Sequence, residues 1–372
     1  MKNLHLKHVE DTIFDGTTLT PLLFIEEAFK FIDGRKSKAA MSVKWDGAPA
    51  FVCGPHPETG KFFVGTKGVF TGKLCFDIPD IAIHYPDSKE LQLKLANIFH
   101  NLKDMGLKQI VQGDLLYWGN SRMIDRVERT ISFQPNTLRY QVGLDTDLGK
   151  TIMDSEIGVV LHTSYKDFDS DATFGIDRDN GYVRNAFVID PRIVYNIPVL
   201  TTMEKQNFEG AWSMFVTMLA QINYDVLSVF TVPKMNDMVK RYLNYEIRQD
   251  TMPNADIFLK FLESNVKHEV SRLKTEKGRK RKYEEWILLT DRLKSHEDLG
   301  RIFRLYNHLV LVKSIIVKAL DRAKSVDVFL PDGQKTGHEG YVITMHGETL
   351  KMVDRYGFAR ANMLHQKAWA GK

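Results

Sequence analysis

The sequence contains little cysteine, no long hydrophobic run and no large excess of one charge. Its two cysteines, Cys53 and Cys75, are not spaced as a metal-ligand pair such as C-x-x-C. No apolar stretch approaches the roughly 18 to 20 residues that a membrane helix needs, and residues 1–8 lack the continuous apolar core of a signal peptide. We therefore expect a protein of the reducing cytoplasm, with no disulfide partner and no membrane partner.

The numbers of basic and acidic residues are nearly balanced. Lys and Arg number 51 and Asp and Glu 47, which gives a formal net charge of +4. A charge this small neither requires nor excludes a nucleic-acid partner, so the placement of the basic residues is more informative than their sum. At 372 residues, with 43% hydrophobic residues, the chain is long enough for two globular domains or for one domain with a large insertion.

Residues 42–52 carry a lysine inside a strand-like apolar pattern, in the sequence Lys44-Trp45-Asp46-Gly47. Side chains alternate along a strand, so Lys44 and Asp46 should face the same side and could contact one ligand. Gly47 allows a turn or the close approach of a ligand to the backbone. A lysine in such a pocket can lose its proton and attack an electrophile. The four residues alone fit a strand-end lysine before a turn equally well, since K-x-D-G is expected by chance about 0.1 times in such a chain.

The periodicity of the apolar residues changes twice along the chain. Helical spacing at residues 20–32 and 86–103 alternates with strand patterns before residue 200, among them 61–70, 109–117, 130–142, 157–165 and 182–195. Residues 203–324 have helical spacing almost throughout, and strand patterns return after the turn at 331–333. We therefore predict an α+β fold, with a mostly antiparallel-sheet core at residues 1–200 and 331–372 and an all-α insertion domain at residues 201–330.

Two further polar residues lie in predicted buried strands. Asp114 interrupts a strongly apolar run, and an acid there is costly to bury unless it meets a cation or hydrogen-bond donors, which favours a functional role. His162 lies near the end of another apolar run, where it is either a ligand or, more commonly, a hydrogen-bonded core residue. Lys67 follows a predicted hairpin, and strand pairing could bring it to the pocket of Lys44.

A basic cluster lies inside the helical block, where six of the ten residues 274–283 are Lys or Arg. It fits a solvated helix face or loop, and it equally fits contacts with a nucleic-acid backbone. The candidate nucleic-acid-binding residues are Lys277, Arg279, Lys280, Arg281 and Lys282.

Five places in the chain, taken in order, resemble the motifs of the covalent nucleotidyltransferase superfamily, the ATP-dependent polynucleotide ligases and mRNA capping enzymes. They are Lys44-Trp45-Asp46-Gly47, Thr66-Lys67-Gly68, Gly113-Asp114, Glu339-Gly340-Tyr341-Val342 and Leu350-Lys351-Met352. His162 lies where that family has a strand flanking the nucleobase. The sequence is most similar to phage-type RNA ligases and to phage proteins described as RNA-ligase-like. The resemblance covers residues 1–200 and 331–372, and the helical block has no counterpart in it.

The resemblance implies an adenylation core in which Lys44 attacks the α-phosphorus of ATP, expels pyrophosphate and becomes lysyl-AMP. The AMP would then pass to a 5′-phosphate end, and a 3′-hydroxyl would displace it to seal the strand. The implied nucleotide-binding residues are Asp46, Gly47, Lys67, Asp114, His162, Glu339 and Lys351, with Asp114 and Glu339 also holding Mg²⁺ or Mn²⁺. The expected role is an RNA ligase of nucleic-acid repair, in the host cytoplasm if the protein is phage-encoded.

Three positions depart from the family pattern. Pro49 replaces a frequent arginine, Asp114 replaces the usual glutamate, and Val353 replaces a second lysine of the fifth motif. Only 21 residues follow Lys351 (372 minus 351), too few for the oligonucleotide-binding (OB) barrel of DNA ligases and capping enzymes, which favours the RNA-ligase type. The alternatives are an adenylyltransferase with another acceptor, a DNA end-sealing ligase, or a degenerate non-catalytic module that binds nucleotide or nucleic acid.

Overall fold

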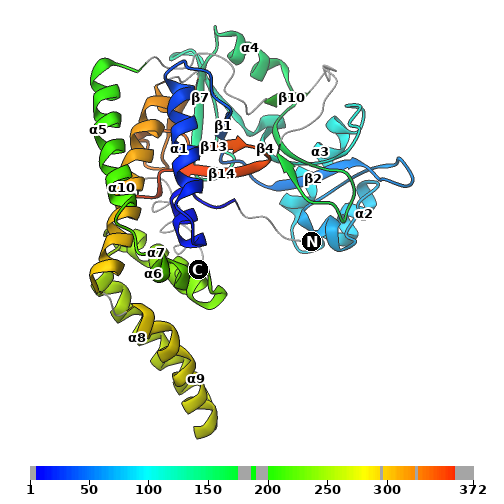
Figure 1. Cartoon of the computed structure of the whole chain (residues 1–372). Coiled ribbons are helices and arrows are strands. Elements are labelled where there is room, and N and C mark those ends of the chain that lie inside the picture. The colour runs from blue at the N-terminus through cyan, green and yellow to red at the C-terminus, as the bar shows by residue number, and fades with distance from the viewer. Residues whose placement is uncertain (1–5, 175–185, 190–199, 294–295, 323–325, 357–372) are drawn as a thin grey trace. The chain divides into compact units, whose positions relative to one another are not determined.

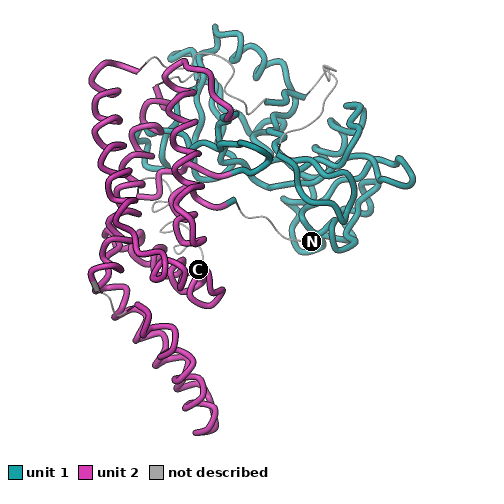
Figure 2. Tube along the Cα trace, in the orientation of Figure 1, with its two compact units in different colours: residues 1–6, 40–196, 323–349 teal, residues 7–39, 197–322, 350–372 magenta. Residues whose placement is uncertain are grey.

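The computed structural model of the chain has an α+β fold (Figure 1) and describes residues 6–174, 186–189, 200–293, 296–322 and 326–356. The chain divides into two compact units (Figure 2). The first unit is rich in strands and contains residues 1–6, 40–196 and 323–349, and the second is helical and contains residues 7–39, 197–322 and 350–372.

The first unit is built on a six-stranded sheet in the order β10-β8-β4-β2-β3, with the short strand β9 paired to β8. All pairs in this sheet are antiparallel except β10 with β8. The strands are β2 (Ala50–Pro55), β3 (Phe62–Gly65), β4 (Ile110–Trp118), β8 (Ile157–Tyr165), β9 (Thr173–Phe174) and β10 (Ala186–Ile189). The predicted central strands at 109–117 and 157–165 are therefore confirmed as β4 and β8.

Two helices, α2 (Ile78–His84) and α3 (Lys89–Leu102), belong to the same unit, and α3 packs against the six-stranded sheet. Ser88 is the N-cap that precedes α3, and its side-chain oxygen accepts a hydrogen bond from the backbone N–H of Leu91. Its apolar residues Leu95 and Ile98 are fully buried in one cluster with strand residues such as Val159. Each such buried side chain contributes roughly 1.5–3 kcal/mol through the hydrophobic effect, which holds the helix on the sheet.

A second sheet of the first unit has five strands in the order β12-β11-β7-β6-β5, and α4 (Asp147–Asp154) packs on β6 and β7. The third sheet has the order β1-β13-β14, in which β13 leads into β14 through the turn at His346-Gly347. The strands are β5 (Arg122–Asp125), β6 (Thr130–Phe133), β7 (Arg139–Gly143), β11 (Asp327–Phe329), β12 (Lys335–Thr336), β1 (Ala40–Lys44), β13 (Gly340–Met345) and β14 (Glu348–Val353). Two short 3-10 helices belong to this unit: η2 (Lys67–Thr71) lies between β3 and α2, and η3 (Gly119–Ser121) connects β4 to β5.

The second unit is arranged around the long helix α10 (His296–Asp321), on which α1 and α5 pack (Figure 1). Two further helices, α8 and α9, are joined by a short turn and pack against each other. Together they extend beyond the other helices of the unit (Figures 1 and 2). The helices are η1 (Glu10–Asp15), α1 (Leu19–Ile32), α5 (Thr202–Leu219), α6 (Tyr224–Ser228), η4 (Val229–Thr231), α7 (Pro233–Gln249), α8 (Ala255–Ser271), α9 (Glu276–Thr290) and η5 (Asp291–Leu293).

A buried ion pair fixes segments from both ends of the chain to α10. The Lys313 ammonium is 2% exposed and donates to the Glu10 carboxylate at 2.6 Å and to the backbone carbonyl of Val353 at 2.8 Å. Nearby, the Arg355 guanidinium donates to Asp11 at 2.6 Å. Breaking a buried pair leaves an uncompensated charge, so these contacts hold the terminal segments in place.

The division of the chain differs from the predicted one in a specific way. Residues 7–39 and 350–372, which were expected in the sheet core, belong to the helical unit, so this unit is not a single insertion. For residues 7–39 the physical reason is the apolar face of α1, where the Phe29 ring stacks on Phe208 of α5 with ring centroids 3.7 Å apart. Most of the predicted strand region 182–195 lies outside the described residues.

Across the described ranges, no helix by itself has both the length and the apolar character needed to cross a membrane. One sharply bent pair, residues 202–219 with 224–231, meets these criteria by length and composition when its two parts are taken together.

Candidate functional site

Lys44 is the last residue of β1, and its backbone is in register with Gly340, the first residue of β13. Glu339 immediately precedes β13, and the Lys44 ammonium donates a hydrogen bond to its carboxylate. The two side chains are 31% and 14% exposed, so solvent or a small molecule can still reach the pair. The pairing of β1 with β13 thus brings together the motifs of Lys44 and Glu339, which lie almost 300 residues apart in the sequence.

Asp46 lies two residues beyond the end of β1, and its carboxylate is buried. One carboxylate oxygen accepts a hydrogen bond from Asn136 Nδ2 at 2.8 Å. The other accepts from the backbone N–H groups of Thr137 at 2.8 Å and Leu138 at 2.9 Å. Both oxygens of this carboxylate therefore accept hydrogen bonds from the protein itself, and these bonds anchor the loop between β6 and β7. The prediction that Asp46 and Lys44 contact one ligand gains no support from these contacts.

Gly47 lies directly against β4. A Cβ atom at this position would be 2.5 Å from Asp114 Cβ and 3.1 Å from the carbonyl oxygen of Leu115, so no larger residue fits without a shift. Just beyond it, the Ala48 N–H donates to that same carbonyl at 2.9 Å. The glycine of the motif is therefore required for the close approach of the chain to β4, and this approach brings the motif next to Asp114.

Asp114 and His162 lie on neighbouring strands and form a pair that the sequence did not predict. Their closest atoms, His162 Nε2 and Asp114 Oδ2, are 3.5 Å apart, and His162 Nδ1 lies 2.7 Å from Thr163 Oγ1. The strand register shifts here, with Gln112 opposite Thr163 but Gly113 opposite Leu161, so His162 is the additional residue of a β-bulge. A bulge redirects side chains locally, which accounts for the contact of His162 with Asp114.

A buried tyrosine connects three of these carboxylates electrostatically. Burial raises the pKa of the Tyr140 hydroxyl well above 10, and the nearby carboxylates of Asp46, Glu339 and Asp114 raise this pKa further. A hydrogen bond from the Asp46 backbone N–H to the hydroxyl, 2.8 Å long, acts in the opposite direction. Tyr140 therefore lies close to the acidic residues of the three acid-containing sequence motifs of the first unit.

The Tyr140 ring also packs against Trp45, with ring centroids 4.8 Å apart, and Trp45 in turn lies 5.5 Å from His338. Aromatic pairs at these distances stabilise local geometry by about 0.5–1.5 kcal/mol each beyond their buried area. Trp45 and His338, the residues next to Lys44 and Glu339 in the chain, are thus held by tilted and edge-to-face ring contacts. Sequence analysis missed this role, because Tyr140 lies in an ordinary alternating strand pattern and gives no signal beyond a buried position.

The remaining predicted nucleotide-binding residues are placed differently. Lys67 is exposed and is the first residue of η2, two positions beyond the end of β3, so the expectation of a strand position is wrong. Lys351 lies in β14 in the part of the strand that belongs to the second unit. Its backbone N–H donates to the Lys7 carbonyl at 2.9 Å, and its carbonyl accepts from the Val9 N–H at 3.1 Å.

No group of three or more His, Cys, Asp or Glu side chains in the described part of the chain is arranged to hold a metal ion. Asp114 and Glu339 therefore do not form a complete protein cage. Mg²⁺ keeps several waters and is commonly held by one or two carboxylates together with substrate phosphates, so it does not require such a group.

The predicted basic cluster lies on α9, which begins after the N-cap residue Thr275. Arg279 and Lys282 have partners within the same unit: the Arg279 guanidinium donates to the Leu273 carbonyl at 3.0 Å, and Lys282 lies 3.9 Å from the Glu269 carboxylate. The other three candidates, Lys277, Lys280 and Arg281, are exposed. The structure thus separates the five predicted residues into two sets with different surroundings.

Neither a curated protein nor a solved structure matches this chain. A family described as "Family of unknown function (DUF6267)" matches residues 3–367, almost the whole sequence. The chain therefore belongs to the DUF6267 family.

Proposed function

We propose that the protein is an ATP-dependent nucleotidyltransferase of the RNA-ligase type, in which Lys44 forms a covalent lysyl-AMP intermediate. The observation that carries this proposal is the pairing of β1 with β13, which joins Lys44 to Glu339 at the end of both strands. A nucleophilic lysine needs a neighbouring group that accepts its proton, and a partly exposed position that a substrate can reach. Lys44 has both.

In the first step the Lys44 amine attacks the α-phosphorus of ATP. A nitrogen–phosphorus bond forms, the bond to the pyrophosphate oxygen breaks, and pyrophosphate leaves. The ammonium must first give up its proton, and Glu339 is hydrogen-bonded to it and positioned to accept that proton. Lys67, which belongs to the same unit as Lys44, is the proposed cation for the phosphate oxygens, where charge develops in the transition state.

Asp114 is the proposed ligand for Mg²⁺ or for the ribose hydroxyls. Its side chain is 21% exposed, and one carboxylate oxygen lies 3.5 Å from His162 Nε2, so a ligand from solvent can reach the carboxylate. When Mg²⁺ is bound it supplies positive charge beside the phosphates. Asp46 has a positioning role in this proposal, because its three hydrogen bonds fix the backbone that follows Lys44.

The AMP group then passes from Lys44 to a 5′-phosphate end of a nucleic acid, and a 3′-hydroxyl displaces AMP to join the strands. RNA is the proposed substrate on the basis of the sequence resemblance to phage-type RNA ligases. A second candidate is a non-catalytic module that binds nucleotide. The observation that favours it is Val353, which is buried in the second unit at the position where the family often has a second lysine.

Self-adenylylation tests the proposal. The full chain is incubated with ATP labelled at the α-phosphate and with Mg²⁺ or Mn²⁺, beside the variants Lys44→Ala and Lys61→Ala. Lys61 is exposed and lies on the hairpin between β2 and β3, so its replacement is a matched control. We expect covalent label on the wild type and on the control, released by pyrophosphate, and none on Lys44→Ala. Absence of label with both metals, from protein shown by mass to carry no AMP, would contradict catalysis and support the second candidate.

A further inference from the structure

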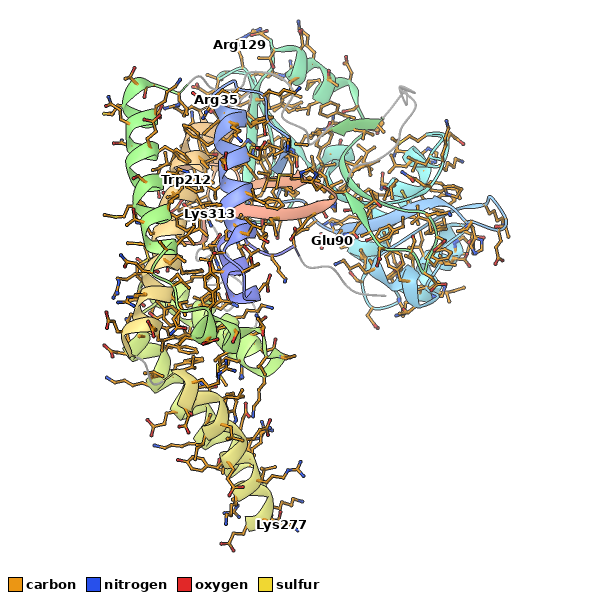
Figure 3. All side chains as sticks on the ribbon, viewed as in Figure 1. Arg35, Glu90, Arg129, Trp212, Lys277 and Lys313 are labelled. Atoms are coloured by element: carbon orange, nitrogen blue, oxygen red, sulfur yellow. The ribbon has the colours of Figure 1, made fainter. Side chains whose placement is uncertain are left out.

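The helices α8 and α9 form a hairpin whose base is fixed and whose tip is exposed (Figures 1 and 2). At the base, Trp286 of α9 is buried, and its indole N–H donates to the Glu269 carboxylate of α8 at 3.3 Å. The Lys234 ammonium of α7 lies 3.7 Å from the centre of the same ring and 3.3 Å from the Glu285 carboxylate. These contacts hold α9 in one orientation on the helical unit, and Lys277 lies at its far end (Figure 3).

The basic residues of α9 serve two different purposes. Arg279 donates hydrogen bonds to the carbonyls of Leu273 and Lys274, at 3.0 and 3.4 Å, and so closes the turn between the two helices. Lys282 lies 3.9 Å from the Glu269 carboxylate of α8 and 4.0 Å from the Glu285 carboxylate of α9. Both side chains are engaged in holding the hairpin together.

Lys277, Lys280 and Arg281 are different. They are exposed, and their spacing of three and four residues places them on one face of the helix, here named the tip face. Within the described part of the chain none of the three has an ion-pair or hydrogen-bond partner. The acids closest in sequence are Glu276, before the tip face, and Glu284, one turn after it. Three unpaired cations on one exposed helix turn attract a polyanion.

We propose that the tip face binds the phosphate backbone of a nucleic acid without reading its sequence. Phosphate contacts from Lys and Arg position a protein on nucleic acid and carry no sequence information. The three side chains of the tip face carry only ammonium and guanidinium groups, with Glu276 and Glu284 one turn to either side of Lys280, so its recognition is electrostatic. The choice of nucleic acid over another polyanion rests on the proposed function, in which a polynucleotide is the acceptor. Binding at the tip face itself requires neither ATP nor Lys44.

The test measures the affinity of the full chain for a fluorescent single-stranded RNA, and for its duplex, at several salt concentrations without ATP. The tip variant carries Lys277→Gln, Lys280→Gln and Arg281→Gln. The matched control carries Lys103→Gln, Lys166→Gln and Lys318→Gln, three exposed lysines elsewhere, so that both variants lose the same charge. A third variant, Arg279→Gln with Lys282→Gln, removes the two cations that hold the hairpin.

Each phosphate contact contributes about 0.7 to the slope of log affinity against log salt for single strands and about 0.9 for duplexes. We expect the tip variant to lose roughly 2 to 3 from this slope for the same reason, and the control to keep the wild-type slope. The third variant should lower the unfolding temperature of the hairpin and retain the slope at temperatures where it is folded. A tip variant with the wild-type slope, or a control that loses as much as the tip variant, would overturn the proposal.

Polyglutamate and vesicles containing anionic lipid test the other possible partners. We expect neither to compete with RNA at equal charge concentration. If polyglutamate or the vesicles displace RNA from the wild type but not from the tip variant, the nucleic-acid proposal is overturned, and that competitor is the partner of the tip face. Lys44→Ala should bind RNA as the wild type does, so a failure of RNA binding and a failure of self-adenylylation remain separate results.

Discussion

The two units use the same chemical pair, a lysine with a glutamate, in opposite ways. In the helical unit the Lys313–Glu10 pair is 2% and 0% exposed, and the lysine also donates to the Val353 carbonyl. In the sheet unit the Lys44–Glu339 pair is 31% and 14% exposed and lies at the ends of two strands. A fully enclosed pair can only hold structure together, whereas a partly open pair can exchange a partner for a substrate. The degree of enclosure, rather than the residue types, separates structure from function here.

The largest expected effect comes from replacing the lysine in each pair. Lys313→Ala leaves the Glu10 carboxylate buried and unpaired, which should lower the free energy of unfolding by about 3–5 kcal/mol. Lys44→Ala removes a partly exposed pair and should cost about 1 kcal/mol or less. Urea denaturation of both variants beside the wild type measures the two changes. Equal losses would show that the distinction between the enclosed and the open pair is incorrect.

Asp46→Asn is the next largest expected change. The asparagine NH₂ group would replace one carboxylate oxygen and would face hydrogen-bond donors, which it cannot accept from. The donors at this site include the backbone N–H groups of Thr137 and Leu138. An unsatisfied buried group of this kind costs about 1–3 kcal/mol. We expect a loss of stability in this range and, if Asp46 only positions Lys44, a lower rate of self-adenylylation with an unchanged KM for ATP. A large rise in KM with unchanged stability would instead indicate that Asp46 contacts the nucleotide.

Gly47→Ala tests the close approach of the chain to β4. The added methyl would lie 2.5 Å from Asp114 Cβ, and the backbone on either side is held by strand contacts. Crowding of this kind costs typically 1–3 kcal/mol. The matched control is Gly60→Ala, where nothing lies within 4 Å of the new Cβ, although a φ of +68° there adds some backbone strain of its own. A Gly47→Ala protein with the stability of the control would contradict the tight packing described here.

The smallest expected effect depends on pH and concerns Glu27 of α1. Hydrogen bonds from the Lys30 ammonium, and then from the Lys38 backbone N–H, lower the pKa of Glu27 from 4.5 to about 2. The lowered pKa means that the ionised form is favoured by folding, so this stabilisation is complete above pH 4.5 and is lost as the pH falls toward 2. Glu27→Gln should therefore be less stable than the wild type at pH 6, with a difference that shrinks between pH 4.5 and 2. A difference that stays constant over this range would contradict the assignment.

The local features of the fold could be predicted from the sequence, and the long-range ones could not. Helical spacing correctly located α1 and α3, and apolar runs located β4 and β8. The same reasoning required a polar partner for Asp114, but it could not identify His162, because a β-bulge sets that contact. Asp46 was expected to contact a ligand, whereas its observed partners lie some 90 residues further along the chain. Periodicity reports which face of an element is buried and carries no information on what covers it.

The basic cluster illustrates the same limit on a smaller scale. The sequence identified Lys277, Arg279, Lys280, Arg281 and Lys282 as one group of candidates. The structure shows that Arg279 closes a turn and that Lys282 lies between two glutamates. Such contacts depend on the packing of α9 against α8, which charge counting along the chain does not describe.

The division of the chain into interleaved segments has a consequence for synthesis on the ribosome. The sheet unit needs residues 326–345 to supply β11, β12 and β13, and the helical unit needs residues 350–356 to supply the partners of Lys313 and Asp11. Neither unit can therefore be completed while translation is still in progress upstream of these segments. A nascent chain with a premature stop before residue 326 would leave both units unfinished. Cellular quality control would then meet a chain with no intact domain, and not one folded domain that lacks its neighbour.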